Sequence, residues 1–256
     1  MKIITVNVNG IRAAEKKGFF TWLKKQNAEV VCIQELRAQE DQLDDKFYPK
    51  DTHTFYHPAQ KKGYSGTGLY CKTKPDQVIF SPWEDIDFEG RFIQADFGNL
   101  SIISIYLPSG SAKQERQNYK MAFIQDRFTP YLKKIQQDGR QYIICGDMNI
   151  VHKEIDIKNF NGNKNRSGCL PEERAWMDKL FNEVGFIDAF REINQEPHQY
   201  TWWSNRGQSW ANNTGWRIDY QILSANLKGT AKSAYVYKDK RFSDHAPLIL
   251  EYQLCN

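Results

Sequence analysis

Nine short runs rich in β-branched and aromatic residues dominate this sequence and predict its β-strands. Several of them alternate apolar and polar residues with a period of two, which is typical of a strand with one buried face. Some runs follow one another directly and others are separated by a helical segment, so we expect mixed sheets. The predicted strands are Ile3–Val8, Val30–Gln34, Thr67–Lys72, Arg91–Phe97, Leu100–Leu107, Gln141–Cys145, Ile218–Ser224, Tyr235–Tyr237 and Leu248–Tyr252.

Three amphipathic stretches predict helices. The first covers Phe19–Gln26. A long one follows Ser111–Gln114, which fits a capping box, and Gly139 ends it. Pro130 lies inside this stretch and predicts a kink or a break. The third covers Pro171–Gly185, with proline in its first turn and glycine at its end.

The chain has 256 residues, with no Pro/Gly/Ser-rich linker, no long block of like charge and no internal repeat. We therefore expect a single domain over residues 1–256. Many strands and few helices favour an α/β fold with two packed mixed sheets flanked by helices. Such a four-layer α/β sandwich would bury this much apolar surface within one domain.

Composition limits the class of protein further. Aromatic residues make up 14% of the chain, which excludes a disordered chain. No stretch approaches the roughly 18 apolar residues of a membrane helix, and the first residues lack the pattern of a signal peptide. Five cysteines without a CxxC pair favour a reduced, cytoplasmic protein with no membrane partner. A net charge of +4 permits a polyanionic partner without requiring one.

Polar residues end several of the apolar strands, where a sheet core would not place them. Loops at strand ends are where rigid scaffolds carry chemistry. In the first and third of these segments the polar pair is spaced by two, so we expect both side chains on one face of an extended segment. The segments are Asn7-Val8-Asn9-Gly10, Gln34-Glu35, Gly146-Asp147-Met148-Asn149, Asp219-Tyr220 and Ser243-Asp244-His245.

Convergence of these loops would mass Glu35, Asp147, Asp219 and Asp244 beside His245. Hard oxygen donors with one imidazole and no thiol suit Mg²⁺ or Mn²⁺ better than zinc. A divalent cation relieves the mutual repulsion of the carboxylates, and the natural reaction is metal-assisted phosphodiester hydrolysis. Each residue alone also fits a turn, a solvated helix start or a cap. Their shared place at the ends of apolar strands favours the functional interpretation.

The segment 200–217 carries four tryptophans, Trp202, Trp203, Trp210 and Trp216. Rings interleaved with arginines, here including Arg217, suit stacking on a displaced sugar or base and binding to phosphates. The alternative is that Trp202 and Trp203 straddle a strand with one ring buried.

Ten motifs in order, nearly from end to end, resemble those of the exonuclease III class of apurinic/apyrimidinic (AP) endonucleases. The resemblance implies the four-layer endonuclease/exonuclease/phosphatase sandwich, duplex DNA as substrate and Mg²⁺ as cofactor. The motifs are NVNGIR at 7–12, IQELR at 33–37, GYSGTGLY at 63–70, EGRF at 89–92, IYLPSG at 105–110, GDMNIVHKEID at 146–156, LPEER at 170–174, YTWWSNR at 200–206, GWRIDY at 215–220 and SDHAPL at 243–248.

The resemblance also implies roles around the metal and the attacking water. Glu35 would ligate the metal, with Asn9 and Asp244 close by. Asp147 would position or deprotonate the water, and Asn7 would hold Asp147 in place. Asn9 stands where some relatives carry Asp, so we expect weaker metal binding rather than its loss.

Further implied roles concern the scissile phosphate. Asn149 would hydrogen-bond the phosphate or the water. His245, oriented by Asp219, would contact a phosphate oxygen, and the Tyr106 hydroxyl would reach the same phosphate. Whether the base is Asp147 or the Tyr106 phenolate stays open at this point.

By the same resemblance, Trp202 and Trp216 would wall a pocket for the flipped-out abasic sugar. A backbone cut 5′ to the abasic site would leave a 3′-hydroxyl and a 5′-deoxyribose phosphate, and we expect a monomer. The remaining implied DNA contacts are Arg37, Tyr64, Arg91, Asn163 and Arg166.

Arg166 and Cys169 depart from the family pattern in a loop that borders the damaged-nucleotide pocket. In the family, a bulky side chain in this loop can block entry of an abasic site, so that the enzyme only trims blocked 3′ ends. The small Ser167 favours a pocket that is open to abasic sites. A mainly 3′-trimming enzyme is therefore one alternative. The others are a phosphatase or phospholipase on the same fold and a non-catalytic DNA-binding relative.

Overall fold

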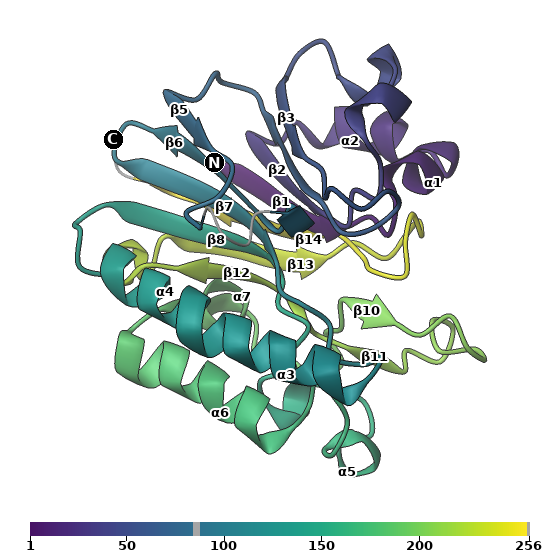
Figure 1. Cartoon of the computed structure of the whole chain (residues 1–256), viewed down its shortest axis with the longest axis vertical. Helices are drawn as coiled ribbons and strands as arrows, with labels where there is room; N and C mark the ends of the chain where they lie inside the picture. The colour runs from purple at the N-terminus through teal and green to yellow at the C-terminus, as the bar shows by residue number, and fades with distance from the viewer. Residues whose placement is uncertain (84–87, 255–256) are drawn as a thin grey trace.

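Two six-stranded sheets form the centre of the computed structural model, which describes residues 1–83 and 88–254 (Figure 1). A separate two-stranded ribbon pairs β10 (Trp202–Trp203) with β11 (Gly215–Trp216). The first sheet has the order β13 (Ala231–Val236), β14 (Leu248–Tyr252), β1 (Lys2–Asn7), β2 (Val30–Gln34), β4 (Thr67–Cys71), β3 (His53–His57). The second has the order β5 (Gln77–Ile79), β6 (Phe92–Phe97), β7 (Leu100–Tyr106), β8 (Gln141–Asp147), β12 (Asp219–Leu223), β9 (Ile187–Asp188).

Both sheets are mixed. β1 pairs with β2 in parallel, and so does β7 with β8, while the other pairs are antiparallel. A parallel pair needs a crossover connection, and helices supply it on the outside of each sheet. As a result, the carboxyl ends of β1 and β2 lie at one edge of the first sheet, and those of β7 and β8 lie at one edge of the second.

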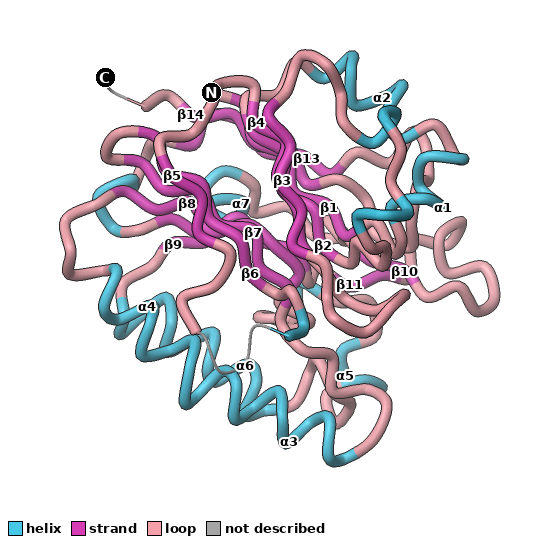
Figure 2. Tube along the Cα trace, turned by 45° about the horizontal axis from the view of Figure 1, so that its top comes forward, coloured by secondary structure: helices cyan, strands magenta, loops and turns pink. Residues whose placement is uncertain are grey.

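Helices cover the two outer sheet faces (Figures 1 and 2). On the first sheet lie α1 (Ile11–Lys16) and α2 (Phe19–Gln26), whose Ile11, Phe19 and Leu23 pack against strand residues. The second sheet is covered by α3 (Gln114–Ala122), α4 (Thr129–Ile135) and α6 (Pro171–Lys179). Two shorter helices, α5 (Phe160–Asn163) and α7 (Ala189–Ile193), complete the α-helices of the described residues.

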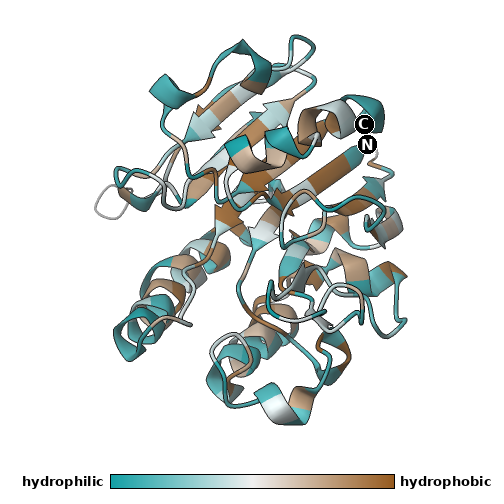
Figure 3. Ribbon diagram, turned by 90° about the vertical axis from the view of Figure 1, so that its right-hand side faces the viewer, coloured by the Kyte–Doolittle hydropathy of each residue, from teal (hydrophilic) through white to brown (hydrophobic). Residues whose placement is uncertain are grey.

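The main core lies between the sheets, where Ile3 and Cys32 of the first sheet meet Ile102 and Ile143 of the second. Figure 3 shows hydrophobic residues gathered along the central strands and hydrophilic residues on the outer surfaces of the helices. Helix, sheet, sheet and helix thus form four layers, and the predicted four-layer sandwich of two mixed sheets is confirmed. None of the described helices is long and apolar enough to cross a membrane.

Most predicted strands and the helix Phe19–Gln26 are confirmed with small shifts at their ends. The predicted strand Tyr235–Tyr237 is wrong in extent. The strand is β13, Ala231–Val236, whose exposed and half-buried residues Lys232 to Tyr235 hide its start from a search for apolar runs. Strands β3, β5, β9, β10 and β11 were not predicted, because β3 begins with the exposed His53 and the half-buried Thr54 and each of the other four is only 2 or 3 residues long.

The predicted capping box at Ser111–Gln114 is wrong. Helix α3 begins at Gln114, and the residue before it, Lys113, makes no capping bond with its side chain. The Ser111 hydroxyl instead lies 3.0 Å from that of Ser109. Near Pro130 the helix does not break. A wider π-helical turn over Phe123–Phe128 precedes it, so the proline falls in the first turn of α4, where no N–H is needed.

Candidate active site

Asp147, at the end of β8, lies at the centre of the residues that the strand ends bring together. In the sheet register it stands between Tyr106 of β7 and Asp219 of β12. Its buried carboxylate accepts hydrogen bonds from Asn7 Nδ2 at 2.9 Å and from the Asn149 N–H at 2.8 Å. The predicted convergence of strand ends is therefore present for Asn7, Asp147, Asn149 and Asp219, and Tyr106, which only the motif resemblance placed in the site, lies beside them.

Asn7, the last residue of β1, joins the two sheets. Its side-chain amide donates to Asp147 Oδ2 and also to Glu35 Oε1, at 2.8 Å. Glu35 follows β2 in a left-handed conformation, with φ of 54°. Arg37 forms an ion pair with Glu35 while its side chain stays 42% exposed. The Asn7 amide thus fixes one carboxylate from each sheet, Glu35 from the first and Asp147 from the second. The partly exposed Arg37 lies beside Glu35.

The two polar pairs spaced by two do not adopt the extended conformation that we expect from the sequence. Asn9 and Asn149 have φ of 46° and 52°, so the chain turns at the second residue of each pair. The Asn9 N–H donates to Asn7 Oδ1 at 2.9 Å, and the Asn149 N–H donates to Asp147 Oδ1 at 2.8 Å. Such Asx turns are common for Asn and Asp, and they override the strand periodicity here.

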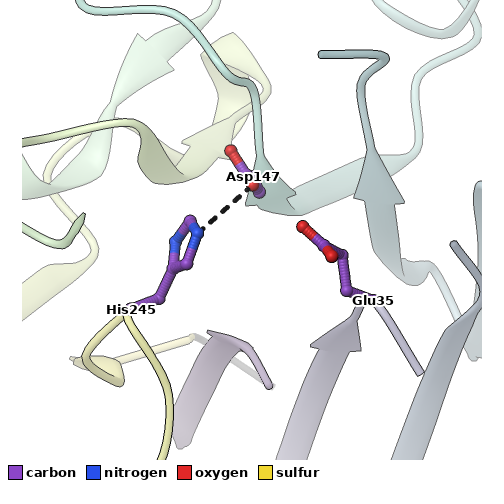
Figure 4. Close-up of side chains that lie close together, drawn as sticks. All are labelled: Glu35, Asp147 and His245. Carbon is purple, nitrogen blue, oxygen red and sulfur yellow. Dashed lines mark ion pairs between the residues drawn. The ribbon is translucent and has the colours of Figure 1, made fainter. Parts of the chain in front are cut away.

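His245 carries the positive charge of the site (Figure 4). Its Nδ1 lies 2.8 Å from Asp219 Oδ2, and its Nε2 lies 3.8 Å from Asp147 Oδ2. Burial alone would lower the pKa of His245. The negative charges of Asp219 and Asp147 outweigh burial and raise the pKa to about 10. The imidazole is therefore protonated at neutral pH, held by one carboxylate and directed at another.

Burial raises the pKa of Asp147 to about 7, and the charges of Asp219 and Glu35 act in the same direction. His245 and the hydrogen bond from Asn7 act against this rise. The pKa of Tyr106 lies well above its usual range, first because the side chain is buried and then because Glu35 and Asp147 are close. Of the two candidate bases, only Asp147 thus titrates near neutrality.

Glu35, Asp147 and His245 could hold a metal ion, because one ligand atom from each lies within 4.8 Å of the others. Figure 4 shows the three side chains pointing toward a common space. A protonated imidazole has no lone pair for a metal. The donors that fit are therefore the carboxylate oxygens of Glu35 and Asp147, which are the ligand type of hard divalent cations.

The other predicted ligands lie beside one another. Asn9 Nδ2 donates to Asp244 Oδ1 at 2.7 Å, and Trp202 Nε1 donates to Asp244 Oδ2 at 3.2 Å. Burial acts to raise the pKa of Asp244, but His245 and these hydrogen bonds lower it overall, so the carboxylate stays charged. Their roles as metal ligands stay predictions.

Trp202 and Trp216 face each other across the ribbon β10–β11, with ring centroids 5.7 Å apart and edge to face. Both side chains are half-buried, so part of each ring is held by the protein and part is accessible to a bound ligand. Trp203, in contrast, is 1% exposed and packs in the main core. The alternative of one buried ring is thus confirmed for Trp203, and a pocket role for the other two stays a prediction.

The suggestion that Arg217 contacts a phosphate is wrong. Its side chain is 0% exposed and pairs with Asp156 at 2.8 Å and with Asp188 at 2.7 Å. Asp156 also binds Arg191, at 2.6 Å. Arg217 lies two residues before the first residue of β12, Asp219, so this buried ion cluster anchors the chain at the start of that strand.

Arg91 lies behind Tyr106 rather than at the surface. Its guanidinium donates to Glu89, to the Tyr106 carbonyl at 3.0 Å and to the Tyr64 hydroxyl at 2.8 Å, and it stacks 4.8 Å from the Tyr106 ring. Arg116 Nη2 also donates to the Tyr64 hydroxyl, at 2.6 Å. The sequence analysis missed Glu89 and Arg116, although the motif EGRF places Glu89 two residues before Arg91. A direct DNA contact by Arg91 would require it to leave these partners.

Asn163 ends the short helix α5, and Arg166 follows it on an exposed loop. Asn163 Nδ2 donates to the Asn159 carbonyl at 2.8 Å, and the Arg166 N–H donates to the Asn163 carbonyl at 2.8 Å. Asn163 and Arg166 make none of the hydrogen bonds described above for Glu35, Asp147 and His245. Their contacts with a DNA strand stay predictions.

The sequence matches the endonuclease/exonuclease/phosphatase family over residues 4–245. The chain belongs to this family. It is 38% identical over 253 residues to an exodeoxyribonuclease of Bacillus subtilis (98% of each chain), and 36% identical over 256 residues to the DNA repair nuclease APEX1 of Danio rerio (98% of this chain, 81% of the relative). Among solved structures, an AP endonuclease from Archaeoglobus fulgidus has a TM-score of 0.88 at 26% identity, covering 99% of this chain and 100% of its own.

The motif resemblance to the exonuclease III class is thereby confirmed. So is the assignment of this family member as an enzyme, a hydrolase of the AP endonuclease and exodeoxyribonuclease III type. A 3′-5′ exonuclease from Neisseria meningitidis shares the fold, with a TM-score of 0.90 at 24% identity over 99% of this chain and 100% of its own.

Proposed function

We propose that this enzyme is a Mg²⁺-dependent DNA repair nuclease that hydrolyses the phosphodiester 5′ to an abasic site in duplex DNA. The products are a 3′-hydroxyl and a 5′-deoxyribose phosphate. The same site removes blocking groups and nucleotides from 3′ ends, as a 3′-phosphodiesterase and 3′-5′ exonuclease. The names of the bacterial and vertebrate relatives, an exodeoxyribonuclease and a DNA repair nuclease, support the class of substrate.

The observation that carries this proposal is the setting of Asp147. It accepts from Asn7 and Asn149, and the cation of His245 lies 3.8 Å away. With a pKa of about 7, Asp147 can accept a proton from an attacking water at neutral pH. Asn7 and the Asn149 N–H hold the carboxylate in one orientation, which keeps the water opposite the leaving 3′ oxygen.

The scissile phosphate is bound by donors in the same cluster. His245 is held protonated by Asp219 and supplies positive charge where negative charge develops on the phosphoryl oxygens. The Tyr106 hydroxyl stays protonated and can donate a hydrogen bond to the same phosphate. Its high pKa argues against a Tyr106 phenolate as the base.

Glu35 would hold the metal, and Asn9 and Asp244 would complete the oxygen donors, which leaves the Asp147 carboxylate to accept the proton of the water. Mg²⁺ suits this set because it prefers carboxylate and amide oxygens, and Mn²⁺ can replace it. When bound, the ion neutralises charge on the phosphoryl oxygens. Asn7 keeps Glu35 and Asp147 at fixed positions relative to each other through its two hydrogen bonds.

DNA is bound around this centre. Trp202 and Trp216 form the wall of a pocket for the extruded abasic sugar, which costs less to flip out because no base pair is broken. Arg37, exposed beside Glu35, contacts a phosphate. The remaining contacts to the DNA strand come from Tyr64, Asn163 and Arg166, and Arg91 acts through the Tyr64 hydroxyl that it holds. The enzyme acts as a cytoplasmic monomer with a single domain, and the family match over residues 4–245 supports the last point.

A gel assay tests the proposal with two substrates, a duplex with one abasic site and a nicked duplex with a 3′ block, each with Mg²⁺ and with EDTA. We expect incision of the first and trimming of the second, both only with Mg²⁺. Asp147→Asn is the matched inactive control. Trimming without incision would favour the 3′-end enzyme. Hydrolysis of neither substrate, with turnover of a phosphoinositide, would refute the proposed function.

A further inference from the structure

Lys120 of α3 and Glu173 of α6 form an ion pair that is completely buried behind the active site. Both side chains are 0% exposed, and Lys120 Nζ lies 2.5 Å from Glu173 Oε1. Neither residue is one of the acidic residues of the active site, Glu35, Asp147, Asp219 and Asp244. Removing two charges from water costs more than their attraction commonly returns, so a buried pair of this kind is weak evidence for a role in stability.

Lys120 reaches the active site through the backbone of Asn149. Its Nζ donates to the Asn149 carbonyl at 2.8 Å. Asn149 itself donates its backbone N–H to Asp147 at 2.8 Å and its side-chain Nδ2 to the Leu107 carbonyl at 2.9 Å. Three bonds thus hold Asn149 in its left-handed conformation, and Lys120 supplies the one on the carbonyl side.

Glu173 holds the loop that precedes α6. Its Oε2 accepts from the N–H groups of Gly168, at 2.6 Å, and Leu170, at 3.0 Å. Gln117 donates to Glu173 Oε1 at 3.0 Å and accepts from the Ser167 hydroxyl at 2.7 Å. The backbone N–H groups of Gly168 and Leu170 and the hydroxyl of Ser167 are therefore bound to the two helices by the buried side chains of Glu173 and Gln117.

The loop in turn lies against the tryptophan wall. The Gly168 carbonyl accepts from the Val151 N–H at 2.7 Å, and Gly168 has φ of +90°. A Cβ at this position would lie 3.0 Å both from the Asn149 carbonyl oxygen and from a ring atom of Trp216. Lys120 and Glu173 thus hold two neighbouring parts of the site, Asn149 on one side and the support of Trp216 on the other.

We propose that Lys120 and Glu173 are positioning residues that set Asn149 and the 167–170 loop relative to Trp216. They govern both the rate of phosphodiester hydrolysis and the preference for an abasic site. The inference rests on the proposed function, since it names residues that act through that site. Neither residue touches substrate. Their effect depends on keeping groups within a fraction of an ångström of the productive arrangement.

The test separates positioning from stability with three variants. Lys120→Met leaves Glu173 buried without its cation and lowers the thermal midpoint. Lys120→Met/Glu173→Leu removes both buried charges, so its midpoint lies above that of Lys120→Met, although Gly168, Leu170 and Gln117 lose the carboxylate to which they donate. Leu132→Ala is the control, because Leu132 is a buried apolar residue in the hydrophobic cluster between the second sheet and its helices and is none of the hydrogen-bonding residues described above.

For the double variant we expect kcat on an abasic duplex to fall about 10- to 100-fold, with KM within about threefold of wild type. The ratio of abasic incision to 3′ trimming falls as well. Leu132→Ala loses thermal stability but keeps kcat and this ratio. A double variant with wild-type kcat and ratio would overturn the inference, and so would a kcat loss of equal size in Leu132→Ala.

Hydrogen exchange gives a readout that needs no activity. The Gly168 and Leu170 amides should exchange faster in the double variant and at wild-type rates in Leu132→Ala. Unchanged exchange would also overturn the inference. If the wild-type enzyme failed to incise abasic DNA, the proposed function would fail, while exchange and the kcat for any hydrolysed phosphodiester would still decide the roles of Lys120 and Glu173.

Discussion

Replacing Asp156 should destabilise the protein strongly, although the residue lies outside the catalytic cluster. Its buried carboxylate receives two bonds from Arg217, at 2.8 and 3.0 Å, and an ion pair from Arg191. In Asp156→Asn the fully buried Arg217 keeps only Asp188 as an anionic partner among the described residues. Breaking a buried pair from one side costs about 3–5 kcal/mol, so we expect a loss of this size at pH 7.

The pKa of Asp156 gives a second magnitude for the same contact. Burial acts to raise this pKa, but Arg217 and Arg191 lower it overall from 3.8 to about 2. At about 1.4 kcal/mol per unit, the shift stabilises the native state by about 2 kcal/mol. Because the native pKa is the lower one, this stability is present above pH 4 and is lost as the pH falls toward 2.

Urea unfolding of wild type and Asp156→Asn, followed by tryptophan fluorescence at several pH values, measures both quantities. The two free energies of unfolding should differ by about 3–5 kcal/mol at pH 7, and the gap should narrow by about 2 kcal/mol between pH 5 and pH 2. Asp178→Asn is the control, since that carboxylate is 44% exposed and its pairs are worth less than about 1 kcal/mol. A gap below about 1 kcal/mol at pH 7, or one that does not narrow in acid, would refute this reasoning.

Three further predictions concern the proposed reaction. Asp147→Asn and His245→Ala should each lower kcat by about 10²–10⁴-fold while abasic-duplex binding persists, and equal losses of binding and rate would contradict the assigned roles. EDTA should abolish cleavage and added Mg²⁺ should restore it; full activity in chelator would remove the metal from the mechanism. Trp216→Ala should lower the ratio of cleavage rates on abasic and intact duplexes about tenfold, because a stacking ring is lost, whereas an unchanged ratio would argue against the pocket.

The sequence predicted the active-site residues best where these residues end an apolar strand. Asn7 and Asp147 end strands of the two sheets, so their convergence could be predicted from the pattern of apolar runs, whereas Tyr106 was placed in the site only by the motif resemblance. The left-handed turns at Asn9 and Asn149 could not, because they depend on hydrogen bonds to the preceding polar side chains. Periodicity describes regular strands, and these residues lie just beyond them.

The burial of charged side chains was the second feature that could not be predicted from the sequence. Lysine, arginine and glutamate are almost never fully buried unless they are paired, so a sequence alone places them at the surface. Arg217 was assigned to a phosphate and Lys120 to no role, and both are completely buried. Their partners come from segments tens of residues away, Asp156 for Arg217 and Glu173 for Lys120, and that pairing becomes visible only in the folded chain.

The pairing of the first and last strands decides when this enzyme can become active. β14 lies between β1 and β13 (Figure 1). The backbones of Met1 and Tyr252 exchange two hydrogen bonds of 2.7 Å. While a ribosome is still adding residues beyond Asp219, β1 has an unpaired edge and His245 does not yet exist. A nascent chain at this stage therefore carries Glu35, Asp147 and Asp219 without the His245 cation, and nuclease activity has to wait until the ribosome has added His245 and β14.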